Sequence, residues 1–536
     1  MQKPDEPTAA AGWRFDNSYA RLPEALFTRE KPLPVRFAGL MLFNEPLAGD
    51  LGLDGDRLRE MGAPIFVGNV LPSGADPLAQ AYAGHQFGHF TNLGDGRAIL
   101  LGEQLTPGGD RFDIQLKGSG RTRYSRGGDG RAVLGPMLRE YVISEGMHAL
   151  GIPTTRSLAV AATGETVRRS TPLPGAVLTR VASSHIRVGT FQYAAALGDR
   201  DLLASLLNYT IARHDPGLAG AEEPALAFLE AVVERQASLV ARWMLVGFVH
   251  GVMNTDNMAI SGETIDYGPC AFVDGYHPDT VFSSIDHAGR YAYANQPTIA
   301  QWNLARLAES LLSLLAGEQE QAIAKLVAIL ETFPERYARH HLAGARAKLG
   351  LTTAEEGDAG LFNDLLEAMQ QTEADFTATF VALASHLDAG SPDAAAGQLA
   401  VRGKSHPWPF STWATPENAE GFRGCQSPHP AAADFFHSLL AGPGFAVWLD
   451  RWQQRLTREP GGPAAAAARM RQVNPVIIPR NLRVEEALAA AEAGDLELVK
   501  RLLEVIRQPF VEIPANEPYR AGAPPGSPAY CTFCGT

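Results

Sequence analysis

The spacing of the apolar residues changes near Asp201, and this change limits the possible fold more than any single motif does. Before Asp201 the chain is rich in glycine and in short runs of β-branched residues, a pattern typical of strands joined by turns. After Asp201 the apolar residues recur at helical spacing over long segments. The sequence therefore predicts an α+β chain with a strand-rich first part and a helical second part.

The strand-rich part is expected to contain one important helix. Residues 96–103 and 111–117 are predicted to form two strands joined by a glycine- and proline-containing turn. Residues 132–150 carry apolar side chains three and four positions apart, which predicts a helix. Further strands are expected at residues 157–162 and 176–182. This order places one helix in the middle of a sheet-forming region.

The helical part is predicted from six segments separated by linkers. Pro334 is expected to break the longest segment. Residues 389–397 and 459–468 are rich in Gly, Pro and Ala and are predicted to be linkers or helix joints. The tail at 514–536 is expected to be poorly ordered up to its last cysteines. The predicted helices cover residues 201–214, 224–248, 298–315, 319–349, 361–387 and 483–505.

The net charge limits the partners that we expect. The 536 residues carry a formal net charge of −13, whereas a nucleic-acid or membrane-surface binder has a basic footprint. The first residues show no secretory signal, and the most apolar windows fall short of a membrane span. Four cysteines are too few for a disulfide scaffold. We therefore expect a cytoplasmic protein with no nucleic-acid or membrane partner.

Two short stretches in the helical part match a pattern that protein kinases use to hold metal ions. Kinases place His-Arg-Asp-x-x-x-x-Asn before Asp-Phe-Gly, and the Asn and the second Asp are metal ligands. Residues 250–257 read His-Gly-Val-Met-Asn-Thr-Asp-Asn, and residues 266–268 read Asp-Tyr-Gly. On this pattern Asn257 and Asp266 are the candidate metal ligands.

The same pattern lacks the kinase catalytic base. Val252 occupies that position, and its side chain cannot accept a proton. An additional acid, Asp256, lies beside Asn257 instead. We therefore predict that the metal chemistry is kept and that the transfer chemistry has changed.

Lys117 and Glu140 are expected to form the pair that binds nucleotide phosphates. Lys117 ends a predicted strand and Glu140 lies in the helix that follows, the order in which kinases use a phosphate-binding Lys and its Glu partner. Each residue alone fits a surface position equally well. Their place upstream of Asn257 and Asp266 favours the functional interpretation.

Glycine-rich loops and arginines surround this pair in the sequence. Glycines at 94–96, 118–120 and 127–130 allow close backbone approach to phosphates, although such segments are more often plain turns. In an acidic chain, a local arginine cluster fits a polyphosphate pocket, and a solvated face is the other interpretation for most of its members. The arginines are Arg97, Arg121, Arg123, Arg126, Arg131, Arg139, Arg180 and Arg187.

Histidines and cysteines offer weaker candidates. His85 and His89 have a spacing that suits a metal on a helix, but the glycines around them favour a structural role or a nucleotide contact. Cys531 and Cys534 resemble a redox dithiol or half of a zinc site. Cys270 is either a redox partner for this tail or a small buried apolar residue.

Several long sequence blocks resemble the selenoprotein O (SelO, YdiU) family over nearly the whole chain. The resemblance implies a protein-kinase-like bilobal fold, once labelled pseudokinase, with an extra helical region at the C-terminus. It also implies transfer of AMP from ATP to Ser, Thr or Tyr hydroxyls of proteins, with ATP bound in a flipped orientation. The blocks are residues 82–90, 113–126, 139–145, 250–258, 266–269, 474–475, 478–481 and 484–486.

The resemblance also implies roles for individual residues. Lys117 would contact the phosphates with Glu140 as its partner, and Asp256 would be the proton acceptor. Asn257 and Asp266 would hold Mg²⁺ or Mn²⁺. In some members the residue third from the end is selenocysteine, where this chain has Cys534, so a redox-linked tail is implied. The nucleotide contacts would include Asp266 together with Gly94, Gly96, Arg97, Asp129, Gly130, Arg180 and Arg187.

The expected organisation follows from these blocks. Residues 1–80 form an N-terminal extension, 81–200 a nucleotide-binding N-lobe, and 201–390 a helical C-lobe with the catalytic loop. Residues 391–513 form a helical extension, and 514–536 a flexible tail. ATP and hydroxyl-bearing proteins are the expected partners of a monomer. Two other interpretations remain open: an atypical phosphotransferase that uses Asp256 as base, and a non-catalytic nucleotide-binding redox scaffold.

Overall fold

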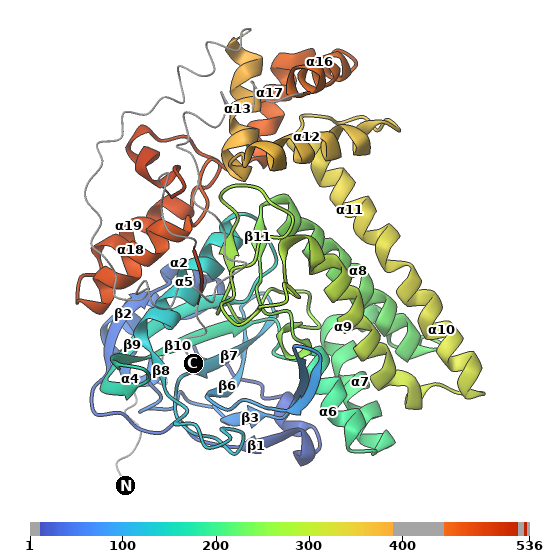
Figure 1. Cartoon of the computed structure of the whole chain (residues 1–536). Coiled ribbons are helices and arrows are strands. Elements are labelled where there is room, and N and C mark those ends of the chain that lie inside the picture. The colour runs from blue at the N-terminus through green and yellow to red at the C-terminus, as the bar shows by residue number, and fades with distance from the viewer. Residues whose placement is uncertain (1–10, 390–443, 524–529, 533–536) are drawn as a thin grey trace.

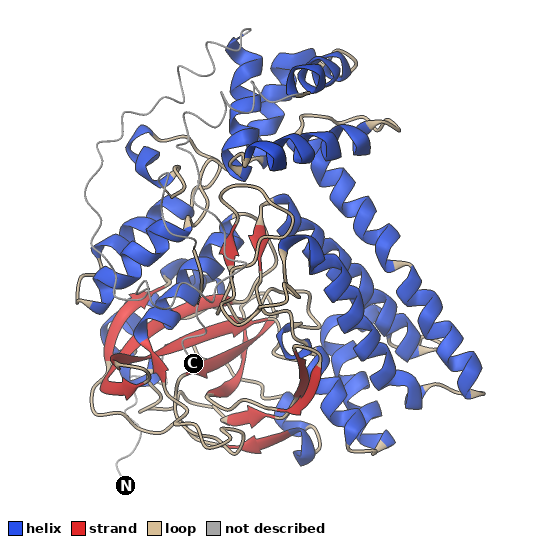
Figure 2. Ribbon diagram, in the orientation of Figure 1, coloured by secondary structure: helices blue, strands red, loops and turns tan. Residues whose placement is uncertain are grey.

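A computed structural model describes residues 11–389, 444–523 and 530–532. The predicted α+β class is confirmed: strands gather in the first part of the chain and helices dominate the second (Figure 1 and Figure 2). Within the described residues, no helix is both long and apolar enough to span a membrane.

An eight-stranded antiparallel sheet forms the strand-rich part, in the order β1-β3-β6-β7-β10-β9-β2, with β8 paired to β10. Lys117 lies inside the sheet, because it pairs with Ala98 on one side and with Leu178 on the other. The first 80 residues supply three of the strands. The strands are β1 (Phe27–Arg29), β2 (Gly39–Phe43), β3 (Leu78–Gln80), β6 (Ala98–Leu105), β7 (Arg111–Lys117), β8 (Ala132–Val133), β9 (Arg156–Arg168) and β10 (Pro172–Ala182).

One helix, α5 (Leu134–Ala149), packs on the sheet as the apolar spacing predicts. Its residues Leu138, Tyr141 and Val142 are buried, which anchors the helix in the core. Glu140 lies on the same helix and is also buried, although it is charged. A buried carboxylate requires a partner, so the packing of α5 already brings Glu140 toward the cations of the sheet.

The helical part begins after β10 and is built around α8, with α9 and α11 beside it (Figure 1). The C-terminal helices α18 and α19 return to the strand-rich part and pack on α5. The helices are α6 (Val188–Ala196), α7 (Arg200–His214), α8 (Pro224–Leu245), α9 (Gln296–Leu311), α10 (Gln319–Glu331), α11 (Phe333–Lys348), α12 (Asp358–Thr372), α13 (Phe376–Ala389), α16 (Phe445–Leu456), α17 (Gly462–Val473), α18 (Asn481–Glu492) and α19 (Glu497–Ile506).

Some predicted boundaries are wrong for identifiable reasons. Residues 361–387 form two helices because Glu373 adopts a left-handed conformation with φ of 49°. Residues 483–505 are interrupted near Gly494, whose φ is 98°. The segment 459–468, predicted as a linker or helix joint, contains the end of the joint between α16 and α17 and the first residues of α17. The tail contains a short helix at Pro514–Tyr519. The break at Pro334 is confirmed, whereas the linker at 389–397 lies, after Ala389, outside the described residues.

Arg480 supports a testable prediction about stability. It is 1% exposed and forms ion pairs with Asp274 at 2.7 Å and Asp375 at 2.8 Å. We expect Arg480→Leu to lower the free energy of unfolding by about 3–5 kcal/mol, because it removes the buried cation that bonds both Asp274 and Asp375. The exposed pair of Arg451 and Asp364 is the control, and Arg451→Leu should cost less than about 1 kcal/mol in urea unfolding. Equal costs for the two variants would contradict this assignment.

Candidate active site

Four charged side chains meet between the sheet, α5 and the loop after β11 (Phe248–Val249). Lys117 Nζ lies 2.6 Å from Glu140 Oε2 and 2.6 Å from Asp266 Oδ1. Arg180 lies on β10, the strand that pairs with the strand of Lys117, and it also bonds both acids. Its Nη2 is 2.6 Å from Glu140 Oε1 and 2.6 Å from Asp266 Oδ1. The four residues therefore form a closed cluster in which each cation is shared by two carboxylates.

The cluster holds its carboxylates ionised. Burial alone would raise the pKa of Glu140, but Arg180 and Lys117 bring this pKa below its ordinary value. Burial would also raise the pKa of Asp266, and Arg180, Lys117 and Arg187 hold it well below the ordinary value. Both acids are therefore anionic at neutral pH, and the cations that surround them outnumber them.

Arg187 extends the positive charge toward a second buried acid. Its Nη2 lies 4.0 Å from Asp266 Oδ2, its Nη1 lies 3.7 Å from Asp95 Oδ1, and its guanidinium sits 4.4 Å from the ring centre of Tyr82. Arg187 Nε and Asp95 Oδ1 are buried without a hydrogen-bond partner among the described residues. Burial raises the pKa of Asp95 to about 6. Orphaned polar atoms of this kind mark a place where a polar ligand fits.

Asp256 stands on the short helix Thr255–Asn257, close to the charge cluster. It is 8% exposed, and its Oδ1 has no hydrogen-bond partner within the described part of the chain. Burial raises the pKa of Asp256 to about 6. A carboxylate with a free oxygen and a pKa near the working pH is suited to accept a proton.

The β4–β5 hairpin, made of β4 (Ala83–Gln86) and β5 (His89–Asn92), covers Asp256. His85 N donates to Thr255 Oγ1 at 2.7 Å, and Gln86 lies against the carboxylate of Asp256. A Cβ atom added at Gly84 would lie 2.2 Å from Asp256 Oδ1. Glycine is therefore required for the hairpin to approach this closely.

Asn257 and Asp266 present oxygens that suit a divalent cation. Asn257 Nδ2 donates to Val252 O at 3.0 Å, which leaves the amide oxygen for a ligand. Asp266 adopts a left-handed backbone with φ of 64° and accepts both short bonds on Oδ1, so Oδ2 is the less engaged oxygen. The described residues contain no cluster of three or more His, Cys, Asp or Glu side chains that could enclose a metal. This donor set fits Mg²⁺ or Mn²⁺ sharing its coordination with phosphate oxygens.

The linker 183–187 joins β10 to α6, and four of its five backbone N–H groups are bonded to the protein. Ser183 N donates to Glu263 at 3.0 Å and His185 N to Asp113 at 2.9 Å. Ile186 N and Arg187 N donate to the hydroxyls of Ser184 and Thr190. Apart from Ser183, which is half-buried, the linker is buried. A nucleotide base that approaches the linker therefore finds these four donors already engaged.

The glycine loops flank the cluster, but their predicted residues are not all joined to it. Cβ atoms at Gly94 and Gly96 would lie 2.4 Å and 2.9 Å from Tyr124, so these glycines seat the 118–131 loop. Arg97 forms no ion pair among the described residues, yet its charge interacts with Asp266 and Glu140. Asp129 is exposed and pairs with Arg169 at 2.8 Å, and Gly130 O accepts from Gly120 N. No contact within the described residues brings Asp129 or Gly130 into the charge cluster.

The arginine group divides in the structure. Arg180, Arg187 and Arg97 lie at the site, whereas Arg139 bonds the carbonyls of Gly268 and Cys270 and therefore braces the loop after Asp266. Arg131 donates to the carbonyls of Leu33 and Pro34. The exposed members are Arg121, Arg123 and Arg126.

The histidine and cysteine candidates fall outside the charge cluster. His85 and His89 lie on the two strands of the β4–β5 hairpin rather than on a helix, and His85 Nδ1 lies 2.7 Å from Gln192 Nε2. Cys270 is a free, buried thiol whose pKa burial raises to about 11. Cys531 is disulfide-bonded, which excludes Cys270 as its partner here, and Cys534 lies outside the described residues. The apolar interpretation of Cys270 is therefore the one that fits.

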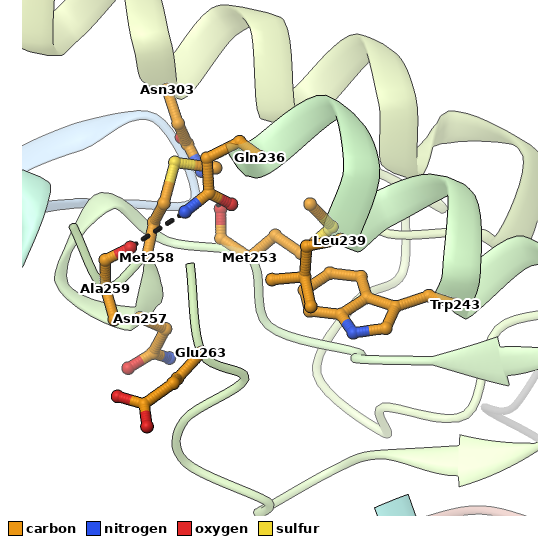
Figure 3. A pocket seen from close by; sticks show the side chains of 9 residues that line it. All are labelled: Gln236, Leu239, Trp243, Met253, Asn257, Met258, Ala259, Glu263 and Asn303. Carbon is orange, nitrogen blue, oxygen red and sulfur yellow. Dashed lines mark hydrogen bonds between the residues drawn. The ribbon is translucent and has the colours of Figure 1, made fainter. Parts of the chain in front are cut away.

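A small pocket lies between α8 and the loop that carries Asn257 (Figure 3). Gln236 Nε2 crosses it to bond Ala259 O at 2.7 Å. Lys117, Arg180 and Asp256 do not line it, so this pocket is packing space behind Asn257 rather than the substrate site. Its lining residues are Gln236, Leu239, Trp243, Met253, Asn257, Met258, Ala259, Glu263 and Asn303.

Three features of the site were not identified from the sequence. The first is Asp95, which lies between Gly94 and Gly96 and faces Arg187. The second is Tyr82, whose ring packs against the guanidinium of Arg187. The third feature is the close approach of Gly84 to Asp256. Tyr82 begins the sequence block 82–90 and Asp95 lies inside the glycine segment 94–96, so both belong to segments that the sequence already indicates. The approach of Gly84 to Asp256 depends on tertiary packing, which no local sequence pattern predicts.

The site is built to bind an anion and to remove a proton beside it. The fixed guanidinium and ammonium groups of Arg180, Arg187 and Lys117 suit phosphate binding, and Asp256 supplies a proton acceptor. This combination defines an enzyme that transfers a phosphate-containing group.

Comparison with known proteins identifies the family. A family model described as "Protein adenylyltransferase SelO" matches residues 12–507. "Protein nucleotidyltransferase YdiU" of Geobacillus kaustophilus is 55% identical over 528 residues, 98% of this chain and 100% of that protein. Proteins of the same name from Syntrophotalea carbinolica and Rhizobium etli are each 53% identical, covering 100% and 98% of this chain and the same shares of those proteins. The chain belongs to the SelO family of protein adenylyltransferases.

Gly84 provides a test of the hairpin's role at the site. We expect Gly84→Ala to lower kcat about 100-fold, because the added methyl group displaces the carboxylate of Asp256 by an ångström or more. The dissociation constant for ATP should stay within about twofold, since Lys117 and Arg180 are untouched. Gly360→Ala is the matched control: nothing lies within 4 Å of its Cβ, and activity should not change. A Gly84→Ala enzyme with parental kcat would contradict the close approach.

Proposed function

We propose that the enzyme transfers AMP from ATP to Ser, Thr or Tyr hydroxyls of proteins and that Asp256 is its proton acceptor. The observation that carries this proposal is the free, buried oxygen of Asp256 beside an anion-binding cluster. As a member of the SelO family, the chain is a protein adenylyltransferase. The assignment of each step to a residue is our inference.

We further propose that the two parts of the chain form the lobes of a protein-kinase-like fold. A strand Lys bonded to a helix Glu, followed in the chain by a metal-binding Asn and Asp, is the kinase order. Val252 stands where a kinase has its base, and Asp256 supplies the acid that this position lacks. The extra helices α18 and α19 brace α5, which carries Glu140.

The reaction follows from the positions of the charges. The protein hydroxyl loses its proton to Asp256 as its oxygen attacks the α-phosphorus. The bond between the α-phosphorus and the oxygen that bridges to the β-phosphorus breaks, and pyrophosphate leaves. Lys117, Arg180 and Arg187 stabilise the negative charge that develops on the pyrophosphate, because they are already fixed by Glu140 and Asp266. No rearrangement of these cations is needed during the step.

Asn257 and Asp266 would hold Mg²⁺ or Mn²⁺, which neutralises phosphate charge when bound. Their amide and carboxylate oxygens match the preference of these ions. The remaining coordination would come from the nucleotide, in agreement with the small number of protein donors.

The bonded linker supports a flipped nucleotide. A base held against the backbone of 183–187 would direct the γ-phosphate toward the catalytic loop, as in a kinase. Because four N–H groups of the linker are engaged by the protein, the base gains no hydrogen bond from them. We propose that the base lies instead toward the 118–131 loop, which contains Asp129 and Gly130, and that the α-phosphate faces Asp256.

Labelled ATP tests the reaction. With Mg²⁺ or Mn²⁺ and a protein acceptor, we expect label from the α-phosphate to appear on protein and label from the γ-phosphate to appear only in pyrophosphate. Asp256→Asn should reduce the transfer rate about 10²- to 10⁴-fold, the usual contribution of a general base, while ATP binding measured by calorimetry persists. Transfer from the γ position alone would identify a phosphotransferase. No transfer by the parent enzyme would favour a nucleotide-binding scaffold.

A further inference from the structure

The outer edge of strand β5 presents unpaired backbone groups to solvent. Leu93 N donates to Tyr82 O at 3.0 Å, and Gly84 pairs with Thr91 and Gln86 with His89. In an antiparallel pair, bonded and non-bonded positions alternate along the strand. The N–H and C=O groups of Phe90 and Asn92 therefore point away from β4, toward the open edge.

The two edges of the β4–β5 hairpin differ in their partners. On β4, the outward N–H of His85 is bonded to Thr255. On β5, the backbone groups of Phe90 and Asn92 have no hydrogen-bond partner among the described residues. Phe90 is 47% exposed, and His89 and Asn92 are exposed as well. Within the described part of the chain, one edge of the hairpin therefore contacts the loop that carries Asp256, and the backbone groups of the other edge have no partner.

A free strand edge is a template for an extended peptide backbone. The hairpin is rigid enough to act as one: Phe87 and Gly88 form its two-residue turn with φ of 49° and 89°, the geometry of a tight type I′ turn. The β4 strand also touches Asp256 through Gly84. A peptide added to β5 would lie two strand spacings, roughly 10 Å, from β4, so residues beyond the paired segment can carry a hydroxyl to Asp256.

One arginine, Arg290, lies at the turn end of this edge. Arg290 lies 4.0 Å from the position of a Cβ at Gly88, and its guanidinium stacks 4.8 Å from the ring centre of Trp302. Arg290 is half-buried and its side chain forms no ion pair within the described ranges of the chain, while the carboxylate of Asp286 accepts from the backbone N–H groups of Arg290 and Tyr291. An acidic segment complements this arginine better than a basic one.

We propose that β5 is the docking edge for the protein substrate: an extended, acidic segment that adds to the hairpin as a third strand and places its hydroxyl at Asp256. This inference rests on the proposed function and specifies how the protein acceptor is recognised. Main-chain pairing explains how one site can accept Ser, Thr and Tyr in different sequences, since the backbone contacts do not depend on side-chain identity.

Proline substitution on β5 tests the pairing. Phe90→Pro removes the outward N–H but none of the bonds to β4, whereas Phe90→Ala keeps that N–H and removes only the ring. With dephosphorylated β-casein, an unstructured acidic protein, as acceptor, we expect the KM for casein to be roughly three- to tenfold higher in Phe90→Pro than in Phe90→Ala, the worth of about one hydrogen bond. Asn92→Pro and Asn92→Ala form a second pair with the same expectation.

The controls separate this inference from the proposed function. The kcat at saturating casein and the dissociation constant for ATP should match within each Pro/Ala pair. Equal KM values in both pairs, or a fall in kcat alone, would overturn the docking edge while AMP transfer by the parent stands. A change in sedimentation with the proline variants would assign the edge to a second copy of the chain. If the parent labels no protein from α-labelled ATP, the proposed function itself fails.

Discussion

The bonds that Lys117 and Arg180 share between Glu140 and Asp266 are the constraint on which the rest of the site depends. Each of the four groups is costly to bury alone, and each is stabilised only because the others are present. The cluster joins β7, β10, α5 and the loop after β11. Any displacement of α5 relative to the loop would therefore break ion pairs of both Lys117 and Arg180. This explains why α18 and α19 pack on the helix and why Arg139 bonds the neighbouring loop.

The surroundings of the cluster decide what chemistry it serves. The linker 183–187 offers few free donors to a base, and the β4–β5 hairpin encloses Asp256 from the opposite direction. Enclosure raises the pKa of Asp256 to about 6 and leaves one of its oxygens free. The same cation cluster could serve transfer of a terminal phosphate. Here it is combined with Asp256 as proton acceptor instead of an acid at the position of Val252.

Local sequence patterns predicted the helices and strands whose boundaries are set by nearby residues. The strands around Lys117, the helix that carries Glu140 and the break at Pro334 follow from apolar spacing and turn residues. The divisions at Glu373 and Gly494 were missed, because a left-handed residue inside a periodic segment changes the backbone without changing the apolar pattern. The three strands from the first 80 residues are short, and short strands give little periodic signal.

The candidate site was predictable where it resembles a known order and hidden where it depends on tertiary packing. Lys117, Glu140, Asn257 and Asp266 stand in an order that a kinase pattern reveals. The buried partner of Arg187, Asp95, and the contact of Gly84 with Asp256 arise only when distant segments meet. Asp129 and Gly130 illustrate the reverse: the family resemblance assigns them to the nucleotide, whereas in the structure Asp129 pairs with Arg169 and Gly130 O accepts from Gly120 N.

The orientation of bound ATP tests the central claim most directly. A crystal structure with Mg²⁺ and a non-hydrolysable ATP analogue would show which phosphorus lies nearest to Asp256. The account predicts the α-phosphorus, with the base away from the linker 183–187 and Arg187 Nε bonded to the nucleotide. A γ-phosphorus next to Asp256, with the base hydrogen-bonded to the linker, would contradict it.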